Sequence, residues 1–152
     1  MQEKNLLRKK YLYLRKKKYF EVEKKFFLPL TKLIKKKFGK KKINLSIYYP
    51  ASFELNVLKL LEIDYVARQT ILLPVIEENN LMNFFKWKEN EVLFVNKYGI
   101  LEPIKSKIVV PNVIIVPLLS FDKSKYRLGY GKGFYDRYLN RYLKKFNNII
   151  TI

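Results

Sequence analysis

Apolar residues in the first third of the chain recur at helical intervals. One stripe predicts a helix over residues 4–15, and a second stripe runs up to Gly39. Pro29 lies near the start of the second stripe, so that helix is expected to begin near Leu28. Both stripes need a surface to cover, and we therefore place both helices in the same domain as the rest of the chain.

The pattern then changes to short apolar runs that alternate with helical spacing. Helices are predicted over 55–63 and 134–146, and loops over 99–103 and 120–133. Strands are predicted over 43–49, 70–76 (interrupted by Pro74 and with a turn at its end), 81–87, 91–95 and 113–118, with another beginning at Ile149. Strands alternating with helices indicate an α/β fold with an open, mostly parallel sheet.

The composition limits the possible chemistry. The 152 residues include no cysteine and no histidine, which excludes disulfides, thiol nucleophiles, imidazole bases and metals held by either side chain. Catalysis must therefore use lysine, arginine, carboxylates, hydroxyls and backbone amides. Phosphoryl transfer, which depends mainly on cationic positioning, is compatible with this set.

The longest apolar stretch, Val109–Phe121, contains two prolines and is too short to cross a membrane. The N-terminus lacks the apolar run of a secretory signal. We expect a cytoplasmic protein without a membrane partner.

The positive charge is concentrated in the first third of the chain. The net charge is +19, and residues 1–42, with 17 basic and 3 acidic side chains, account for +14 of it. Such a segment could bind RNA or an anionic membrane surface. However, 26 of the 32 basic residues are lysine, which an AT-rich coding sequence would also produce. We keep an RNA-binding module as an alternative and do not expect nucleic acid as the main partner.

Three of the five glycines alternate with other residues at Gly129, Gly131 and Gly133, between an apolar run and a predicted helix. Such glycines permit positive φ and let backbone amides approach a ligand, while the helix start adds partial positive charge. Arg127 and Lys132 add full charges suited to phosphate. The spacing matches neither a Walker A loop nor a dinucleotide fingerprint, so the pattern indicates an anion site or, alternatively, a flexible turn.

Residues 116–122 and 126–139 closely resemble the signature of the 5-formyltetrahydrofolate cyclo-ligase family. The opening Lys4–Arg8 and the segment Tyr48–Glu54 resemble further family elements, and Leu73-Pro74, the region 85–87 and residues 99–103 match weaker landmarks. The family converts 5-formyltetrahydrofolate and MgATP to 5,10-methenyltetrahydrofolate, ADP and phosphate in folate one-carbon metabolism. The resemblance implies this ligase activity and a single three-layer α/β domain over 1–152, with helices on both faces of the sheet.

The resemblance also implies site residues. Arg127 and Lys132 would act on the transferring phosphoryl group, and Asp136 would bind Mg²⁺. Glu54 could hold a protonated pterin nitrogen; otherwise it is a solvated loop residue, just as Asp136 could simply favour a helix start. ATP contacts are implied for Lys4, Asn5, Leu6, Leu7, Arg8, Arg127, Leu128, Gly129, Tyr130, Gly131, Lys132, Gly133, Phe134 and Tyr135. Folate contacts are implied for Tyr49, Glu54, Tyr130, Gly131, Lys132, Gly133 and Phe134.

The chain departs from the family pattern at two places. Phe134 occupies a position that is often tyrosine, and the sequence stops at Ile152, where the family continues with a strand and an acidic segment that supplies a second magnesium ligand. A relative that binds ATP or folate without turnover is therefore a second alternative. We expect a monomer in either case.

Overall fold

The computed structural model describes residues 2–143, 145–146 and 148–152. Its helices are α1 (Gln2–Lys17), α2 (Leu28–Phe38), α3 (Asp64–Ala67) and α4 (Phe134–Leu143), with short 3-10 turns at Lys24–Phe27, Val57–Leu60 and Glu78–Asn80. Its strands are β1 (Asn44–Ser46), β2 (Thr70–Ile76), β3 (Met82–Lys86), β4 (Leu93–Val95), β5 (Leu101–Pro103), β6 (Val113–Ile114), β7 (Ser120–Phe121), β8 (Arg127–Leu128) and β9 (Ile150–Thr151).

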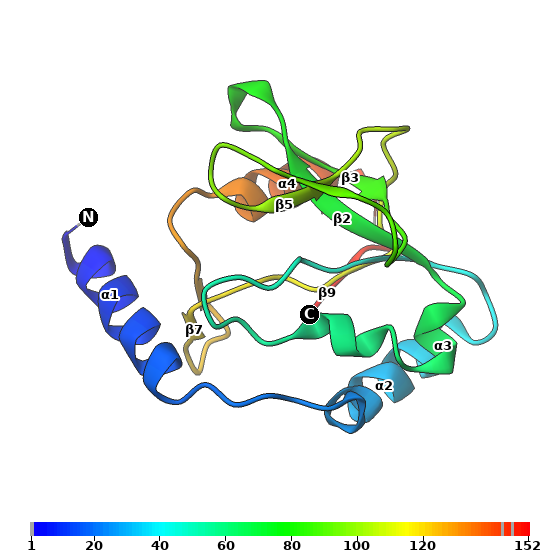
Figure 1. The fold of residues 1–152 in the computed structure, drawn as a ribbon, viewed down its shortest axis with the longest axis horizontal. Helices are drawn as coiled ribbons and strands as arrows, with labels where there is room; N and C mark the ends of the chain where they lie inside the picture. The colour runs from blue at the N-terminus through cyan, green and yellow to red at the C-terminus, as the bar shows by residue number, and fades with distance from the viewer. Residues whose placement is uncertain (1, 144, 147) are drawn as a thin grey trace.

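A five-stranded sheet in the order β3-β2-β1-β6-β9 forms the centre of the fold. Strands β2, β1, β6 and β9 pair in parallel, and β3 joins the edge antiparallel to β2. In Figure 1, α4 lies on one side of this sheet, and α2 and α3 lie on the other. The expected α/β fold with a mostly parallel sheet and helices on both faces is thus confirmed.

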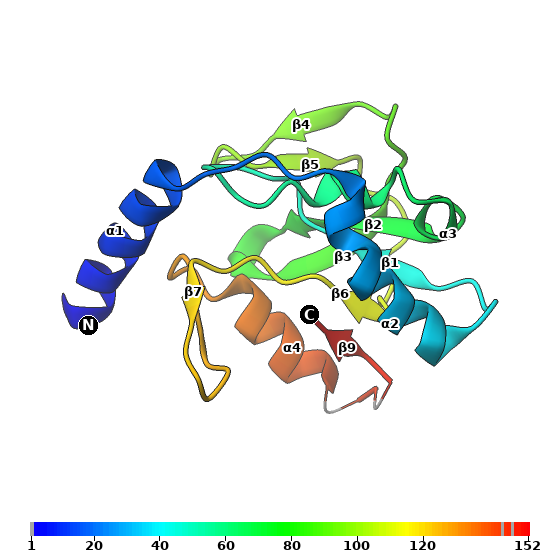
Figure 2. The same ribbon diagram turned by 90° about the horizontal axis from the view of Figure 1, so that it is seen from below.

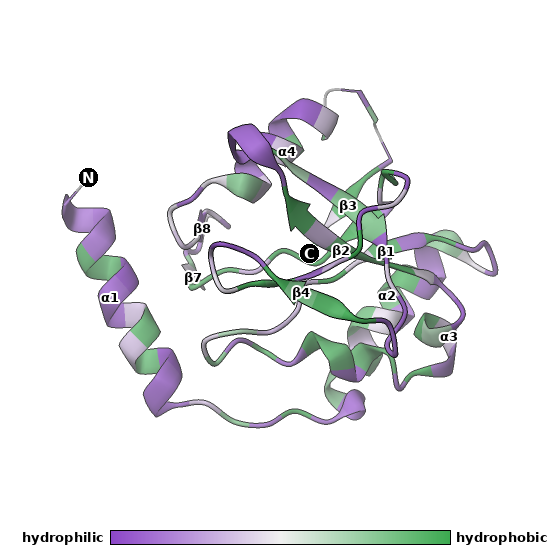
Figure 3. Ribbon diagram, turned by 45° about the horizontal axis from the view of Figure 1, so that its top comes forward, coloured by the Kyte–Doolittle hydropathy of each residue, from purple (hydrophilic) through white to green (hydrophobic). Residues whose placement is uncertain are grey.

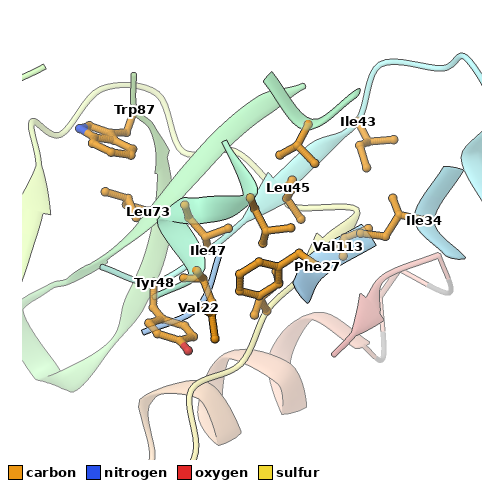
Figure 4. Packing of buried hydrophobic residues seen from close by; sticks show 14 residues of the cluster. Val22, Phe27, Ile34, Ile43, Leu45, Ile47, Tyr48, Leu73, Trp87 and Val113 are labelled. Carbon is orange, nitrogen blue, oxygen red and sulfur yellow. The ribbon is translucent and has the colours of Figure 1, made fainter. Parts of the chain in front are cut away.

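Two hydrophobic clusters cover the two faces of the sheet. Successive strand residues point to opposite faces, so Leu73 joins one cluster and Leu72 joins the other. The larger cluster packs the sheet against the α2 side through Phe27 and Ile34, as Figure 4 shows. The smaller one packs the sheet against Tyr138 of α4. The position of α4 fixes where the preceding glycine segment lies.

Strand β2 continues through Pro74, where the sequence predicted an interruption. Leu72 O and Ile76 N both face away from β3, since they bond to Ile47 N and Glu102. Alternate residues of a strand direct their backbone groups to the same side, so the N–H that Pro74 lacks would also face away from β3. On that side, the pairing of β2 with β1 has already ended at Leu72. Proline therefore interrupts no ladder bond.

Other expected elements also differ from the structure. The predicted loop 99–103 contains β5, which forms a hairpin with β4, and the loop 120–133 contains the β7–β8 hairpin. The helical spacing at 55–63 produces only a 3-10 turn, and the predicted helix 134–146 ends at Leu143; residue 144 lies outside the described residues. Strands β1 and β6 are shorter than predicted: their ladder pairs only Leu45 with Val113 and Ser46 with Ile114.

Helix α1 buries no residue fully, and of its apolar stripe Tyr11 and Leu14 are half-buried while Leu7 is exposed, so the stripe covers a surface only in part. It stands beside the main body and is joined to it by an extended segment (Figures 1 and 2). Coloured by hydropathy, it is mainly hydrophilic with separate apolar patches (Figure 3). What connects α1 to the rest is polar, as described below. No helix among the described residues is long and apolar enough to cross a membrane.

Candidate active site

Two loops that follow parallel neighbours of the sheet meet at one edge. Strand β1 leads into the loop that ends at Glu54, and β6 leads through the β7–β8 hairpin into the glycine segment 129–133. Because the carboxyl ends of parallel strands lie at the same edge, both loops are brought together there. Tyr130 confirms this by donating its hydroxyl to Glu54 Oε1 over 2.5 Å.

Two of the three glycines in the glycine segment have the positive φ that the sequence suggested. Gly131 and Gly133 have φ of 97° and 69°, and α4 begins at Phe134 immediately afterwards. Gly129 does not have positive φ, so its conformation does not require glycine. The segment therefore places backbone turns and the N-terminus of a ten-residue helix side by side, an arrangement suited to anions.

Arginine 8 brings α1 to this segment. Its Nε donates to Gly129 O at 3.0 Å, and its Nη1 donates to Asn5 Oδ1 at 2.7 Å. Two of the five residues expected from the opening element are thus held at the glycine segment. The other three, Lys4, Leu6 and Leu7, lie on the same helix with exposed side chains.

Glu54 is a buried carboxylate held from two sides. Its Oε2 accepts the Ala51 N–H at 2.9 Å within a turn in which Ser52 and Phe53 have positive φ, while Oε1 accepts the Tyr130 hydroxyl. Burial raises the pKa of Glu54, and the two hydrogen bonds together with the charge of Arg15 oppose that rise. The alternative of a solvated loop glutamate is wrong, since Glu54 is only 9% exposed.

Arg15 is a site residue that the sequence analysis missed. Its Nη1 donates to the Tyr130 hydroxyl at 2.5 Å, and its Nη2 donates to Leu118 O. The available signal was its spacing: Arg15 follows Arg8 by two helical turns and so lies on the same face of α1.

The two expected catalytic cations have different surroundings. Arg127, at the start of β8, pairs with Asp136 in the first turn of α4 at 2.5 Å. The Nζ of Lys132 lies 5.3 Å from the ring centre of Tyr98. Tyr98, in the β4–β5 turn, also packs against Phe134 with ring centroids 5.5 Å apart, and no motif around Tyr98 singles it out.

The remaining expected residues lie at different depths. Leu128 lies in β8, and its carbonyl accepts the Leu119 N–H at 2.8 Å. The Tyr135 hydroxyl is buried, without a hydrogen-bond partner among the described residues, and burial raises its pKa. Tyr49 packs edge-on against Trp87, with centroids 6.3 Å apart.

The residues around Asp136 fit only one kind of magnesium site. No group of three or more His, Cys, Asp or Glu side chains comes together in the part of the chain that the structure describes. An all-protein cage is therefore not available from these residues. A single exposed carboxylate such as Asp136 can still serve a Mg²⁺ ion that takes its other ligands from water and phosphates.

Comparison with known proteins agrees with this architecture. The model of the 5-formyltetrahydrofolate cyclo-ligase family matches residues 1–152. The chain is 28% identical over 109 residues to the 5-formyltetrahydrofolate cyclo-ligase of Haemophilus influenzae, covering 67% of this chain and 58% of that protein. It is 32% identical over 106 residues to the cyclo-ligase of Mycoplasma genitalium, covering 67% of this chain and 54% of that protein.

The fold is also similar to the solution structure of Aquifex aeolicus 5,10-methenyltetrahydrofolate synthetase. The TM-score is 0.61 at 29% identity, over 91% of this chain and 72% of that chain. The matches to the two curated relatives span little more than half of each relative's length. Since the family match nevertheless extends over residues 1–152, the chain belongs to the 5-formyltetrahydrofolate cyclo-ligase family.

Proposed function

We propose that this protein catalyses the ATP-dependent cyclisation of 5-formyltetrahydrofolate to 5,10-methenyltetrahydrofolate, with release of ADP and phosphate. Family membership supports the reaction class. The observation that carries the proposal is the Tyr130–Glu54 hydrogen bond. It joins an anion-binding glycine segment to a buried carboxylate 76 residues away, so a nucleotide and a pterin would be bound side by side.

The nucleotide side consists of the glycine segment and the cations around it. ATP phosphates would bind the amides at the start of α4, with Arg8, Arg127 and Lys132 nearby. The formyl oxygen of the folate would attack the γ-phosphorus, giving a phosphorylated formyl group and ADP. Such transfer is accelerated by alignment and by cations around the developing charge, roles that we assign to Arg127 and Lys132.

The folate side is centred on Glu54. A carboxylate accepts hydrogen bonds only, so Glu54 suits the N–H donors of a reduced pterin. Its burial strengthens each such bond because few water molecules compete. Held beside the nucleotide, the folate N10 would then attack the activated carbon and expel phosphate, which closes the ring.

Asp136 is the residue that would hold Mg²⁺ in this proposal. A bound Mg²⁺ neutralises phosphate charge during such transfers. The contribution of the chain would be one carboxylate at the first turn of α4, close to the phosphate-binding amides. Its present partner Arg127 would then be released toward the phosphates.

The test is the appearance of the methenyl chromophore from 5-formyltetrahydrofolate and MgATP. We expect turnover in the full chain and a loss of about 100-fold or more in Lys132→Ala. Lys123→Ala removes an exposed lysine in the nearby β7–β8 turn and should retain the rate. Absence of turnover at saturating substrates would reject the proposal, and calorimetric binding of both ligands in that case would favour the binding-only alternative.

A further inference from the structure

Three side chains far apart in the sequence form one continuous chain of hydrogen bonds. Arg15 Nη1 donates to the Tyr130 hydroxyl at 2.5 Å, and that hydroxyl donates to Glu54 Oε1 at 2.5 Å. The guanidinium of Arg15 also lies 5.9 Å from the centre of the Tyr130 ring. The hydroxyl therefore has its acceptor role filled by Arg15, which leaves its proton directed at Glu54.

Arg15 is itself held in place by the segment between β6 and β7. Its Nη2 donates to Leu118 O, in the segment that follows β6. One guanidinium thus connects α1, the carboxyl end of a central strand and the glycine segment. A planar, multiply donating guanidinium can satisfy two fixed acceptors at once, whereas a lysine ammonium offers no such preset geometry.

The groups facing Glu54 define its electrostatic state. Tyr130 and Arg15 favour the carboxylate, by a hydrogen bond and by charge. Burial opposes it, and the charge of Glu54 in turn raises the pKa of the neighbouring Tyr48 and Tyr135 hydroxyls. The strongest compensation for burial is the Tyr130 hydrogen bond, followed by the bond from the Ala51 N–H and then by the charge of Arg15, the one positively charged group among those named.

We propose that Arg15 is a positioning residue: by holding the Tyr130 hydroxyl on Glu54, it couples the nucleotide-binding glycine segment to the folate-binding carboxylate. The naming of the two ligands rests on the proposed function, but the positioning role does not. Because Tyr130 lies between Gly129 and Gly131, any movement of the glycine segment on nucleotide binding is transmitted through its hydroxyl to Glu54. Occupancy of one side should therefore favour occupancy of the other.

The first experiment uses the ligand-free protein. The Glu54 side-chain carboxyl is followed by carbon-13 NMR against pH in wild type, Tyr130→Phe, Arg15→Gln and the double variant. Because the Tyr130 hydrogen bond and the Arg15 charge both lower the Glu54 pKa, each single variant should raise it. If Arg15 acts through Tyr130, the rise in the double variant is smaller than the sum of the two single rises. Lys17→Gln, which removes a charge from the same helix, is the matched control.

The second experiment measures coupling by calorimetry. A non-hydrolysable ATP analogue is titrated with and without saturating 5-formyltetrahydrofolate. Wild type and Lys17→Gln should bind the analogue about five-fold or more tightly when folate is present, and this ratio should fall toward one in Arg15→Gln and Tyr130→Phe. If Arg15→Gln fails to fold, Arg15→Lys takes its place. It keeps the positive charge but loses the planar, multiply donating guanidinium, so we expect a coupling ratio between that of wild type and one.

The outcomes separate this inference from the proposed reaction. The inference would be overturned if Arg15→Gln had the same Glu54 titration and the same coupling ratio as Lys17→Gln. It would also be overturned if the Glu54 pKa rises of the two single variants added up strictly in the double variant. If wild type shows no turnover but the Glu54 pKa rises in the variants are non-additive, the proposed reaction is rejected and the positioning role of Arg15 is retained. If wild type binds neither ligand, the NMR titration alone decides.

Discussion

The guanidinium carbon of Arg8 lies 3.0 Å from the point that a Cβ on Gly131 would occupy. Helix α1 buries no residue fully, so this close approach and the two arginine contacts to the glycine segment help to hold it against the site. The absence of a side chain at Gly131 therefore serves the docking of α1 as well as the backbone of the loop. Glycine is required here for two separate reasons.

Gly131→Ala should release Arg8 from the glycine segment. The added methyl group would push the flexible guanidinium off Gly129 O, and alanine at a φ of 97° adds strain of about 1–3 kcal/mol. We expect a lower Tm and at least ~10-fold weaker ATP binding, measured by thermal unfolding and calorimetry. Gly129→Ala is the control, because a Cβ there has nothing within 4 Å and φ is not positive. Equal behaviour of the two variants would contradict the docking role.

Glu54→Gln should stabilise the protein while weakening folate binding. The Glu54 pKa is raised by burial above its unfolded value. Such a group contributes stability below the unfolded pKa and loses it as pH rises through the folded pKa. At pH 8 the variant should therefore have a higher Tm than wild type, and the difference should disappear as pH falls below the ordinary carboxyl range. The exposed Glu89→Gln should show neither effect. A Tm gain that is independent of pH would argue against a buried charge at Glu54.

The sequence predicted the parts of the site that depend on local spacing. The glycine segment and the following helix start could be recognised because both are encoded within a few residues. Arg15 was not selected, because its spacing from Arg8 shows only that the two share a face of α1, whereas its contact with Tyr130, 115 residues away, depends on the fold. Tyr98 was missed for the same reason, because its role depends on a hairpin whose second strand, β5, the sequence predicted to be a loop.

The limits of the strand predictions have a related cause. Apolar runs marked the central strands, but the length of a ladder is set by the neighbour with which it pairs. The run at 113–118 thus forms paired strand only at Val113–Ile114, opposite Leu45 and Ser46. In the same way, Pro74 was taken as an interruption of the strand because the sequence does not show that pairing with β1 ends at Leu72.

Phe84→Ala should destabilise the fold and loosen the start of α4. Phe84 is fully buried on the face of the sheet that packs against α4, with its ring 4.7 Å from that of Tyr138 and 6.4 Å from that of Tyr135. Removing such a ring costs about 3–5 kcal/mol, measurable by urea unfolding. Phe94→Ala, at a site that is 56% exposed, should cost much less. Similar losses in both would mean that Phe84 does not anchor α4.

Tyr98→Leu should affect Lys132 rather than stability. The Tyr98 ring lies under the Lys132 ammonium at 5.3 Å, and a half-exposed contact of this kind is worth about 0.5–1 kcal/mol. Leucine keeps an apolar group against Phe134 but removes the ring face. We expect kcat to fall by several-fold with little change in Tm. Tyr126→Leu, an exposed tyrosine in the β7–β8 turn, serves as the control. A matching decrease in both variants would exclude a specific role of the ring.

Asp136→Asn should change the magnesium requirement of the reaction and leave stability almost unchanged. Its ion pair with Arg127 is solvated, since the Asp136 side chain is 74% exposed, and such pairs contribute about 0–1 kcal/mol. Loss of the carboxylate should raise the Mg²⁺ concentration needed for half-maximal turnover by about ten-fold or more. The alternative role of Asp136 is simply to favour the N-terminus of α4.

Asp64→Asn separates the two roles of Asp136. Asp64 is likewise in the first turn of its helix, α3, and is exposed, so its replacement removes a helix-start charge away from the glycine segment. If Asp136 serves only its helix, both variants should shift Tm slightly and leave the magnesium titration where it is in wild type. A shift confined to Asp136→Asn would identify this carboxylate as the magnesium ligand, because Arg127 alone cannot provide an oxygen to the metal.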